Sequence, residues 1–165
     1  MSNITLGSLS YISCEELAEQ LHASPLAPSF PSNLAIIDVR DSDHVGGHIR
    51  GSTWVPSNEL DYKTPELVRN LKDKDVVVFH CALSQQRGPS AALRYLREKE
   101  RLDPGSKSVT KEGEEIKEGG NKEDGGEESQ KVMVLRGGFT QWQEKYGPDK
   151  TLTEAWQKDI WEFGY

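Results

Sequence analysis

The amino-acid sequence predicts an α/β domain, in which helices flank both faces of a five-stranded parallel sheet. Hydrophobic stretches of strand length, such as 34–39, 76–79 and 131–135, alternate with stretches whose apolar residues recur at helical spacing. The run 76–79 is an unbroken series of β-branched and aromatic residues, which is typical of a strand covered on both faces. No internal repeat is visible, so right-handed crossovers would connect the strands of a single sheet.

Length and composition limit the classes of protein that the chain can form. Its 165 residues suit one domain with one core, but a hydrophobic fraction of 35% is low, which predicts that some segment stays unpacked. The net charge of −7 disfavours nucleic acid and acidic membranes as partners, and no apolar run approaches a membrane span. Two cysteines and the lack of a signal peptide argue against secretion. We therefore expect an intracellular protein, cytoplasmic or nuclear, that needs no cofactor.

Short elements precede the central part of the chain. Residues 1–8 are mostly small or polar and are predicted to form an N-terminal tail. Ser13 and Glu16 have the spacing of a capping box, which opens the first helix. After the strand 34–39, we expect a short strand at 52–56 and a helix opened by Thr64-Pro65-Glu66.

The two cysteines are far apart in the sequence. Cys14, in the first turn of the first helix, is either a resolving thiol for Cys81 or a bystander near the surface. Nothing in the sequence brings the two together, and we favour the bystander. Two distant cysteines also cannot build a structural zinc site, so we expect no metal.

Acidic residues follow the strand 34–39. Because ligand sites in α/β sheets form beyond the carboxyl ends of strands, Asp38 and Asp41 are candidate acids. An aspartate and an arginine so placed more often pair with each other, and we favour a pairing with Arg40 that fixes the loop.

The centre of the chain combines a buried strand, a polar loop and a helix. The strand 76–79 ends just before Cys81. Pro89 is tolerated only in the first turn of a helix, so the helix should begin close to Arg87. Cys81 would therefore lie at the carboxyl end of a strand, one loop away from a helix N-terminus.

This position predicts a nucleophile and an anion site. A thiol beside a helix N-terminus or a guanidinium ionises more readily, and the unpaired N–H groups there also bind tetrahedral oxyanions. Five residues separate Cys81 from Arg87, enough for the chain to wrap one anion and return an arginine fork to it. We expect Cys81 and Arg87 to be catalytic. The predicted substrate-binding residues in this loop are Ala82, Leu83, Ser84, Gln85, Gln86 and Arg87.

The proton donor for the leaving group is not evident. His80 adjoins Cys81, but successive strand side chains point to opposite faces, so we expect His80 to orient the loop rather than act as a base. Residues 82–86 contain no carboxylate. The candidate donors or relays are Ser84, Asp38, Asp41, Glu59 and Asp61.

Residues 104–130 differ sharply in composition from the rest. They contain four lysines, eight acidic residues and six of the fifteen glycines, and so carry four of the seven net negative charges. Such a segment cannot bury enough apolar surface to offset the entropy of ordering. We expect a disordered surface loop, and favour a tolerated insertion over a tether or a modification site.

The remaining chain resumes the α/β pattern. A strand at 131–135 leads through a glycine pair into a helix that carries Trp142. Arg136 follows the carboxyl end of this strand, and we expect it at the pocket mouth as a substrate-binding residue. Residues 148–165 carry large apolar side chains at helical spacing and are predicted to form a C-terminal helix docked on the domain.

Three segments resemble one known family. Residues 80–89, HCALSQQRGP, are similar to the active-site loop of the rhodanese-fold cysteine phosphatases. This group includes the M-phase inducer phosphatases, eukaryotic arsenate reductases and small single-domain relatives in fungi and plants. The stretches 38–52 (DVRDSDHVGGHIRGS) and 134–139 (VLRGGF) resemble the upstream signature and the last turn of that family. The resemblance implies a rhodanese-like catalytic domain over 9–147, interrupted by 104–130.

The resemblance implies several reactions. The main expectation is hydrolysis of phosphate monoesters, in phosphorylated proteins or small aryl phosphates, through a thiophosphate on Cys81. The active-site loop of the M-phase inducer phosphatases carries acidic residues. Residues 82–86 of this chain carry none, which disfavours activation of protein kinases as its biological role. An alternative is arsenate reduction with an external thiol such as glutathione or glutaredoxin. Sulfur transfer is less favoured, since those relatives use a loop one residue shorter, and a non-catalytic phosphopeptide-binding module would need no thiol.

Overall fold

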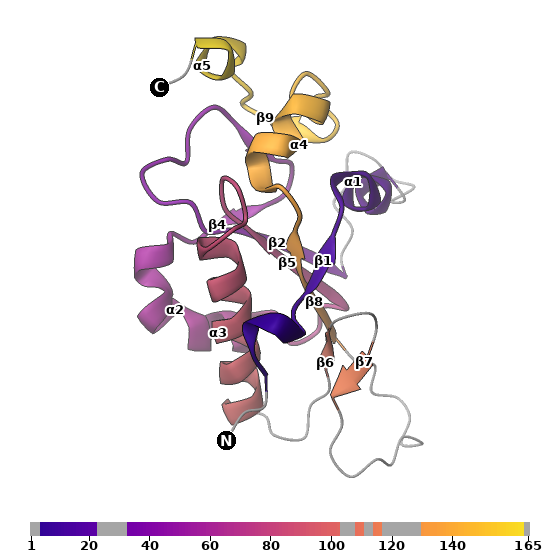
Figure 1. The fold of residues 1–165 in the computed structure, drawn as a ribbon, viewed down its shortest axis with the longest axis vertical. Coiled ribbons are helices and arrows are strands. Elements are labelled where there is room, and N and C mark those ends of the chain that lie inside the picture. The colour runs from indigo at the N-terminus through magenta and orange to yellow at the C-terminus, as the bar shows by residue number, and fades with distance from the viewer. Residues whose placement is uncertain (1–3, 23–32, 103–107, 111–113, 117–129, 164–165) are drawn as a thin grey trace.

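The computed structural model shows one α/β body with an elongated outline (Figure 1). It describes residues 4–22, 33–102, 108–110, 114–116 and 130–163 of the 165-residue chain. No helix within these ranges is long and apolar enough to cross a membrane.

A parallel sheet of five strands forms the centre of the body, as the sequence predicts. Its strands, in spatial order, are β4 (Thr53–Trp54), β2 (Leu34–Asp38), β5 (Val76–His80), β8 (Gln130–Leu135) and β1 (Ser10–Ile12). Every neighbouring pair is parallel. Asp38 lies opposite both His80 and Trp54, so the carboxyl ends of β2, β4 and β5 meet at one edge. The candidate residues of the site follow these ends.

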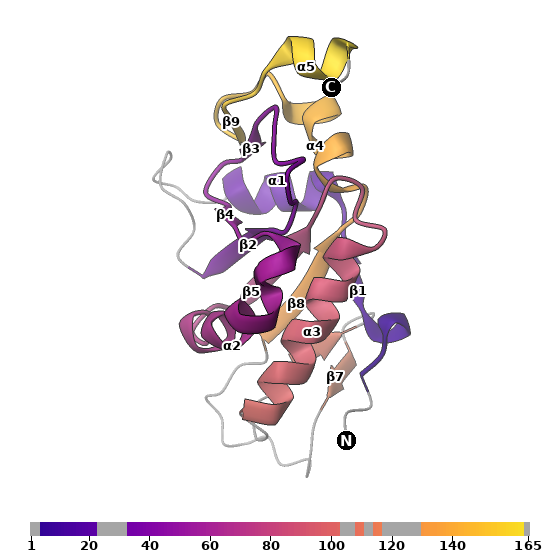
Figure 2. The same ribbon diagram turned by 90° about the vertical axis from the view of Figure 1, so that its left-hand side faces the viewer.

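Helices cover both faces of the sheet (Figures 1 and 2). They are α1 (Cys14–His22), α2 (Leu60–Asn70), α3 (Arg87–Leu102), α4 (Gly138–Tyr146) and α5 (Lys158–Phe163), with 3₁₀ turns η1 (Leu6–Ser8) and η2 (Ser57–Glu59). One buried cluster joins α2 and α3 to Val77 and Phe79, and a second joins α1 and α4 to Val78. The alternation along β5 therefore separates two cores, as expected for a strand buried on both faces.

Two helix starts test the sequence patterns directly. Ser13 and Glu16 form the predicted capping box, with Glu16 N–H donating to Ser13 Oγ at 3.0 Å and Ser13 N–H donating to Glu16 Oε1 at 3.1 Å. The predicted start of α2 at Thr64 is wrong, because the helix begins a turn earlier, at the buried Leu60. Pro65 lies inside this helix, where it removes one N–H donor near the N-terminal end.

Two segments that the sequence predicts to be a loop and a tail, 104–130 and 1–8, contain ordered structure in the residues that are described. Within 104–130, β6 (Ser108–Thr110) pairs parallel with β8, and β7 (Glu114–Ile116) pairs antiparallel with β6. The rest of 104–129 lies outside the described residues, so the disordered loop stays a prediction there. Within 1–8, Ile4 is buried and its carbonyl accepts two hydrogen bonds from Arg97.

For residues 148–165 the sequence predicts one helix, but the described part, 148–163, contains a strand and a short helix. β9 (Thr153–Glu154) pairs antiparallel with β3 (His48–Ile49), apart from the main sheet, and α5 follows. Trp161 of α5 packs against Phe139, with 5.7 Å between ring centroids, and its Nε1–H donates to Gly46 O at 2.9 Å. These contacts attach α5 to α4 and to the loop that follows β2.

Candidate active site

Cys81 lies where β5 ends, and α3 begins at Arg87 as predicted. The Cys81 side chain is buried, and its sulfur accepts hydrogen bonds from the Ser84 N–H at 3.2 Å and the Gly88 N–H at 3.3 Å. The loop therefore turns back on its own first residue. Two amide donors, one in the loop and one in the first turn of a long helix, are a suitable environment for a negatively charged sulfur.

The start of α4 fixes the orientation of the first peptides in the loop. Phe139 N–H donates to Cys81 O at 3.0 Å, and Thr140 N–H donates to Ala82 O at 2.9 Å. Because C=O and N–H point in opposite directions in a trans peptide, the next two loop N–H groups point away from α4. Gly138 permits this contact: its φ is +63°, and a Cβ there would lie 2.4 Å from Ala82 O.

Ser84 is the strained residue of the loop. Its φ of +57° is in the left-handed region, which is costly for a residue with a side chain. This conformation accompanies the hydrogen bond from Ser84 N–H to the Cys81 sulfur. Its hydroxyl is buried and has no hydrogen-bond partner among the described residues, so the loop contains a polar group whose partner a bound anion could supply.

Arg87 is held by two carboxylates that follow β2. Its Nη1 and Nη2 donate to the two oxygens of Asp43 at 2.8 and 2.7 Å, and Nη1 also lies 3.2 Å from Asp41 Oδ2. The hydrogen bonds from Arg87 lower the pKa of Asp43 to about 2, and the two carboxylates raise the pKa of Arg87. Asp43 is a site residue that the sequence analysis missed. Its only signal was its place just beyond the carboxyl end of a central strand.

The four carboxylates predicted as general acids lie in different surroundings. Asp41 accepts hydrogen bonds from the Ser57 hydroxyl at 2.6 Å and contacts Arg87. Asp61, on α2, is exposed and pairs with Arg94 of α3, while Glu59 ends the turn η2. Asp38 is completely buried. The identity of the acid stays a prediction.

Asp38 forms an ion pair with Arg40, the structural pairing that the sequence analysis favoured. Arg40 donates to both carboxylate oxygens of Asp38, with 2.7 Å from Nη2 to Oδ2. The same guanidinium donates to Val45 O and Gly47 O, and it lies 4.4 Å from the centroid of the Phe139 ring. Burial opposes the charge of Asp38, yet the nearby His80 and the hydrogen bonds from Arg40 keep the pKa of Asp38 below its ordinary value. The pair thus anchors the loop that carries Asp41 and Asp43.

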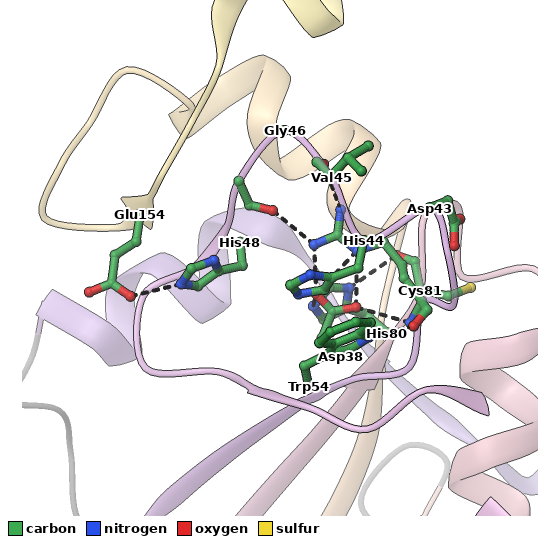
Figure 3. A network of polar contacts seen from close by, with 12 residues as sticks. Asp38, Asp43, His44, Val45, Gly46, His48, Trp54, His80, Cys81 and Glu154 are labelled. Carbon is green, nitrogen blue, oxygen red and sulfur yellow. Dashed lines mark hydrogen bonds and ion pairs between the residues drawn. The ribbon is translucent and has the colours of Figure 1, made fainter. Parts of the chain in front are cut away.

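His80 connects this buried pair to the loop. Its Nδ1 lies 3.0 Å from Cys81 O, and its Nε2 lies 3.8 Å from Asp38 Oδ2. Figure 3 shows the imidazole turned toward Asp38 while the Cys81 sulfur points the other way. Burial lowers the pKa of His80, which favours the neutral ring with its proton on Nδ1. His80 therefore orients the loop, as predicted from strand alternation.

We expect Asp38→Asn to destabilise the fold by about 3–5 kcal/mol, because it leaves the buried Arg40 charge without its partner. Urea unfolding of the variant measures this loss. Asp61→Asn is the matched control, since Asp61 also pairs with an arginine but is 85% exposed, and it should cost at most about 1 kcal/mol. Equal losses in the two variants would contradict the anchoring role of Asp38.

Two other residues from the sequence analysis, Arg136 and Cys14, make contacts outside the Cys81 loop. The Arg136 guanidinium lies 5.0 Å from the centroid of the Tyr11 ring on β1, so a role in substrate binding stays a prediction. Cys14 is not near the surface as expected but buried, with Sγ 3.8 Å from Arg136 O, and burial raises its pKa to about 11. Both cysteines are free thiols. Among the described residues, no group of three or more His, Cys, Asp or Glu side chains could hold a metal ion.

The parallel sheet and the cysteine loop between β5 and α3 define an α/β domain with a buried thiol in the loop that precedes a long helix. Residues 13–145 match the family model for the rhodanese-like domain, and the chain belongs to this family.

Similar proteins and a solved structure agree with the assignment to this family. The chain is 31% identical to the CDC25-like phosphatase YCH1 of Saccharomyces cerevisiae, over 98% of this chain and 99% of that protein. It is 36% identical to arsenate reductase 2.1 of Oryza sativa, over 90% of this chain and 76% of that protein. The structure of Ygr203w from Saccharomyces cerevisiae, described as a homolog of single-domain rhodanese and the Cdc25 phosphatase catalytic domain, covers 99% of both chains at a TM-score of 0.69 and 28% identity.

Proposed function

We propose that this protein is a cysteine-dependent phosphatase that hydrolyses phosphate monoesters of the phosphotyrosine or dual-specificity type. The observation that carries the proposal is the Cys81 sulfur, which accepts hydrogen bonds from the Ser84 N–H of the loop and the Gly88 N–H of the helix that begins at Arg87. The likeness to a CDC25-like phosphatase over nearly the whole chain supports the same reaction. A phosphorylated protein or a small aryl phosphate is the proposed substrate, and an intracellular location, cytoplasmic or nuclear, belongs to the same proposal.

The proposed mechanism has two displacements at phosphorus. The loop amides from Ala82 to Arg87, together with the guanidinium, bind the phosphate oxygens and stabilise their charge in the transition state. The Cys81 thiolate attacks in line, the bond to the leaving oxygen breaks, and that oxygen takes a proton from a general acid. Water then attacks the thiophosphate, which releases inorganic phosphate and restores the thiolate. Among the predicted acids, Asp41 is one that contacts Arg87.

Arsenate reduction is the second candidate, and the likeness to a rice arsenate reductase favours it. In that reaction Cys81 would displace water from arsenate to form an arsenic–sulfur adduct. An external thiol such as glutathione would then attack the Cys81 sulfur, so that the arsenic–sulfur bond breaks and arsenic leaves as arsenite, with both electrons coming from oxidation of the two thiols to a mixed disulfide. A second external thiol, that of glutathione or glutaredoxin, would resolve the mixed disulfide and restore Cys81. An external thiol is needed because the buried Cys14 makes its contact with the Arg136 carbonyl, not with Cys81.

Parallel assays of the purified protein test these alternatives. They measure hydrolysis of an aryl phosphate, arsenate reduction coupled to glutathione, and sulfur transfer from thiosulfate to cyanide. Hydrolysis without the other two activities is expected. Arsenate reduction without hydrolysis would replace the main proposal by the second candidate, and binding of a phosphopeptide without turnover would replace both by a binding module.

A further inference from the structure

The contacts of Arg87 leave one edge of its guanidinium available. A guanidinium has five N–H donors, which form two forks that can each hold two oxygens. Both Nη1 hydrogens and one Nη2 hydrogen are directed at Asp41 and Asp43. No described residue accepts from Nε or from the second Nη2 hydrogen. The fork formed by Nε and Nη2 is therefore free to hold two oxygens of one anion.

The carboxylates that occupy the other edge are themselves fixed. Asp43 Oδ1 accepts from the Asp41 N–H at 2.9 Å, which closes the turn between them. Asp41 in turn accepts from the Ser57 hydroxyl and from the Asn58 N–H at 3.2 Å, which connects it to η2. Further along the loop, Arg40 donates to Gly47 O and so ties this segment to the buried Asp38 pair. The two carboxylates that bind Arg87 are therefore themselves held in place, by the Asp41 N–H and by residues of η2.

We propose that Asp43 is a positioning residue, which holds Arg87 by its Nη1–Nη2 edge so that the Nε–Nη2 edge faces an oxyanion in the Cys81 loop. This inference rests on the proposed function only in taking a phosphate-like anion as the ligand. The opposite interpretation is that Asp43 competes with the anion for Arg87. Two features favour the positioning role, called the clamp below: the edge needed for a bidentate contact is open, and the carboxylate that holds the other edge is itself fixed by the Asp41 N–H.

If Asp43 positions Arg87, removing its charge should weaken the binding of an anion, whereas removing a competitor should strengthen it. Asp43→Asn keeps an Oδ1 acceptor for the Asp41 N–H but loses the charge and one of the two bonds to Arg87. We expect the variant to bind tungstate at least about tenfold more weakly, since a small misplacement of a binding group is costly. Binding is read as protection of Cys81 from alkylation by iodoacetamide, followed by the mass of the Cys81 peptide. Unchanged or tighter tungstate binding would overturn the clamp, and tighter binding would identify Asp43 as a competitor.

Two controls separate positioning from general loss of structure. Glu98→Gln removes a carboxylate that also pairs with an α3 arginine, Arg101, and should leave tungstate protection unchanged. In an Arg87→Lys background, Asp43→Asn should alter protection by less than about twofold, because a residue that acts through Arg87 has no effect without its fork. A full tenfold effect in that background would overturn the proposal.

The same assay distinguishes this inference from the proposed function. If tungstate protects the wild-type protein and aryl phosphate is not hydrolysed, the phosphatase proposal fails while the clamp still stands on the behaviour of Asp43→Asn. If tungstate does not protect wild-type Cys81, there is no anion site next to Arg87 and the clamp fails with it. With hydrolysis present, Asp43→Asn should lower kcat/KM by at least about tenfold, and the Arg87→Lys background should abolish that effect.

Discussion

Replacing Cys81 by serine is expected to reduce aryl phosphate hydrolysis by at least about a thousandfold, because the nucleophile that forms the intermediate is lost. Serine is nearly isosteric and can still accept hydrogen bonds from the Ser84 and Gly88 amides, so the loop geometry should survive. Its hydroxyl remains protonated where a thiol ionises, and it therefore attacks phosphorus far more slowly. The measurement is the steady-state rate with an aryl phosphate, together with a test for phosphate covalently bound to the wild-type protein.

The other cysteine provides the matched control for this experiment. Cys14 is buried in the first turn of α1, and the structure shows no contact between its sulfur and Cys81. Cys14→Ala should therefore keep hydrolysis within about twofold of wild type, as for other residues outside a catalytic unit. A Cys81→Ser protein with wild-type rates would remove the covalent mechanism. Loss of activity in Cys14→Ala without loss of stability would instead show that the second thiol takes part.

Arg87→Lys should lower kcat/KM by about 10²–10³-fold even though the positive charge is kept. Arg87 has a planar fork that can hold Asp43 on one edge and an anion on the other, while a lysine ammonium offers no fork. Loss of one well-placed donor to a developing charge typically costs an effect of this size. Steady-state kinetics with an aryl phosphate measure the change.

A second arginine on the same helix is the control for Arg87→Lys. Arg94 also forms an ion pair with a carboxylate, Asp61, but this pair lies on the exposed side between α2 and α3. Arg94→Lys should change kcat/KM by less than about twofold, as expected for a surface ion pair. If Arg87→Lys behaved like Arg94→Lys, the guanidinium would not be part of the anion site.

Much of the fold could be predicted because its signals are local. Val77, Val78 and Phe79 are buried on the two faces of the sheet as the composition of their strand indicates, and Pro89 limits the start of α3 so closely that Arg87 proves to be its first residue. The boundary of α2 is harder to predict, since Thr64-Pro65 is typical of a helix start but the helix begins at Leu60. Leu60 is buried, and whether it is buried depends on the neighbours that the completed fold supplies.

Cys81 and Arg87 were predictable for a related reason: one strand, one loop and one helix, adjacent in the sequence, define their position. Asp43 and Gly138 were not. Asp43 reaches Arg87 from 44 positions away, and Gly138 is needed because its backbone packs on the carbonyls of Cys81 and Ala82. No local pattern indicates either contact, because both depend on which strands become neighbours.

The sequence alone was enough to predict the class of fold and to single out Cys81 and Arg87 as the candidate nucleophile and its arginine. The surroundings of these residues became visible only in the folded chain: the carboxylates on one edge of Arg87, the α4 amides that orient the loop, and the buried pair of Asp38 and Arg40. The physical reason is the range of the forces involved. Hydrophobic periodicity and backbone preferences act between neighbours in the chain, while hydrogen bonds and ion pairs form between groups that the completed sheet brings together.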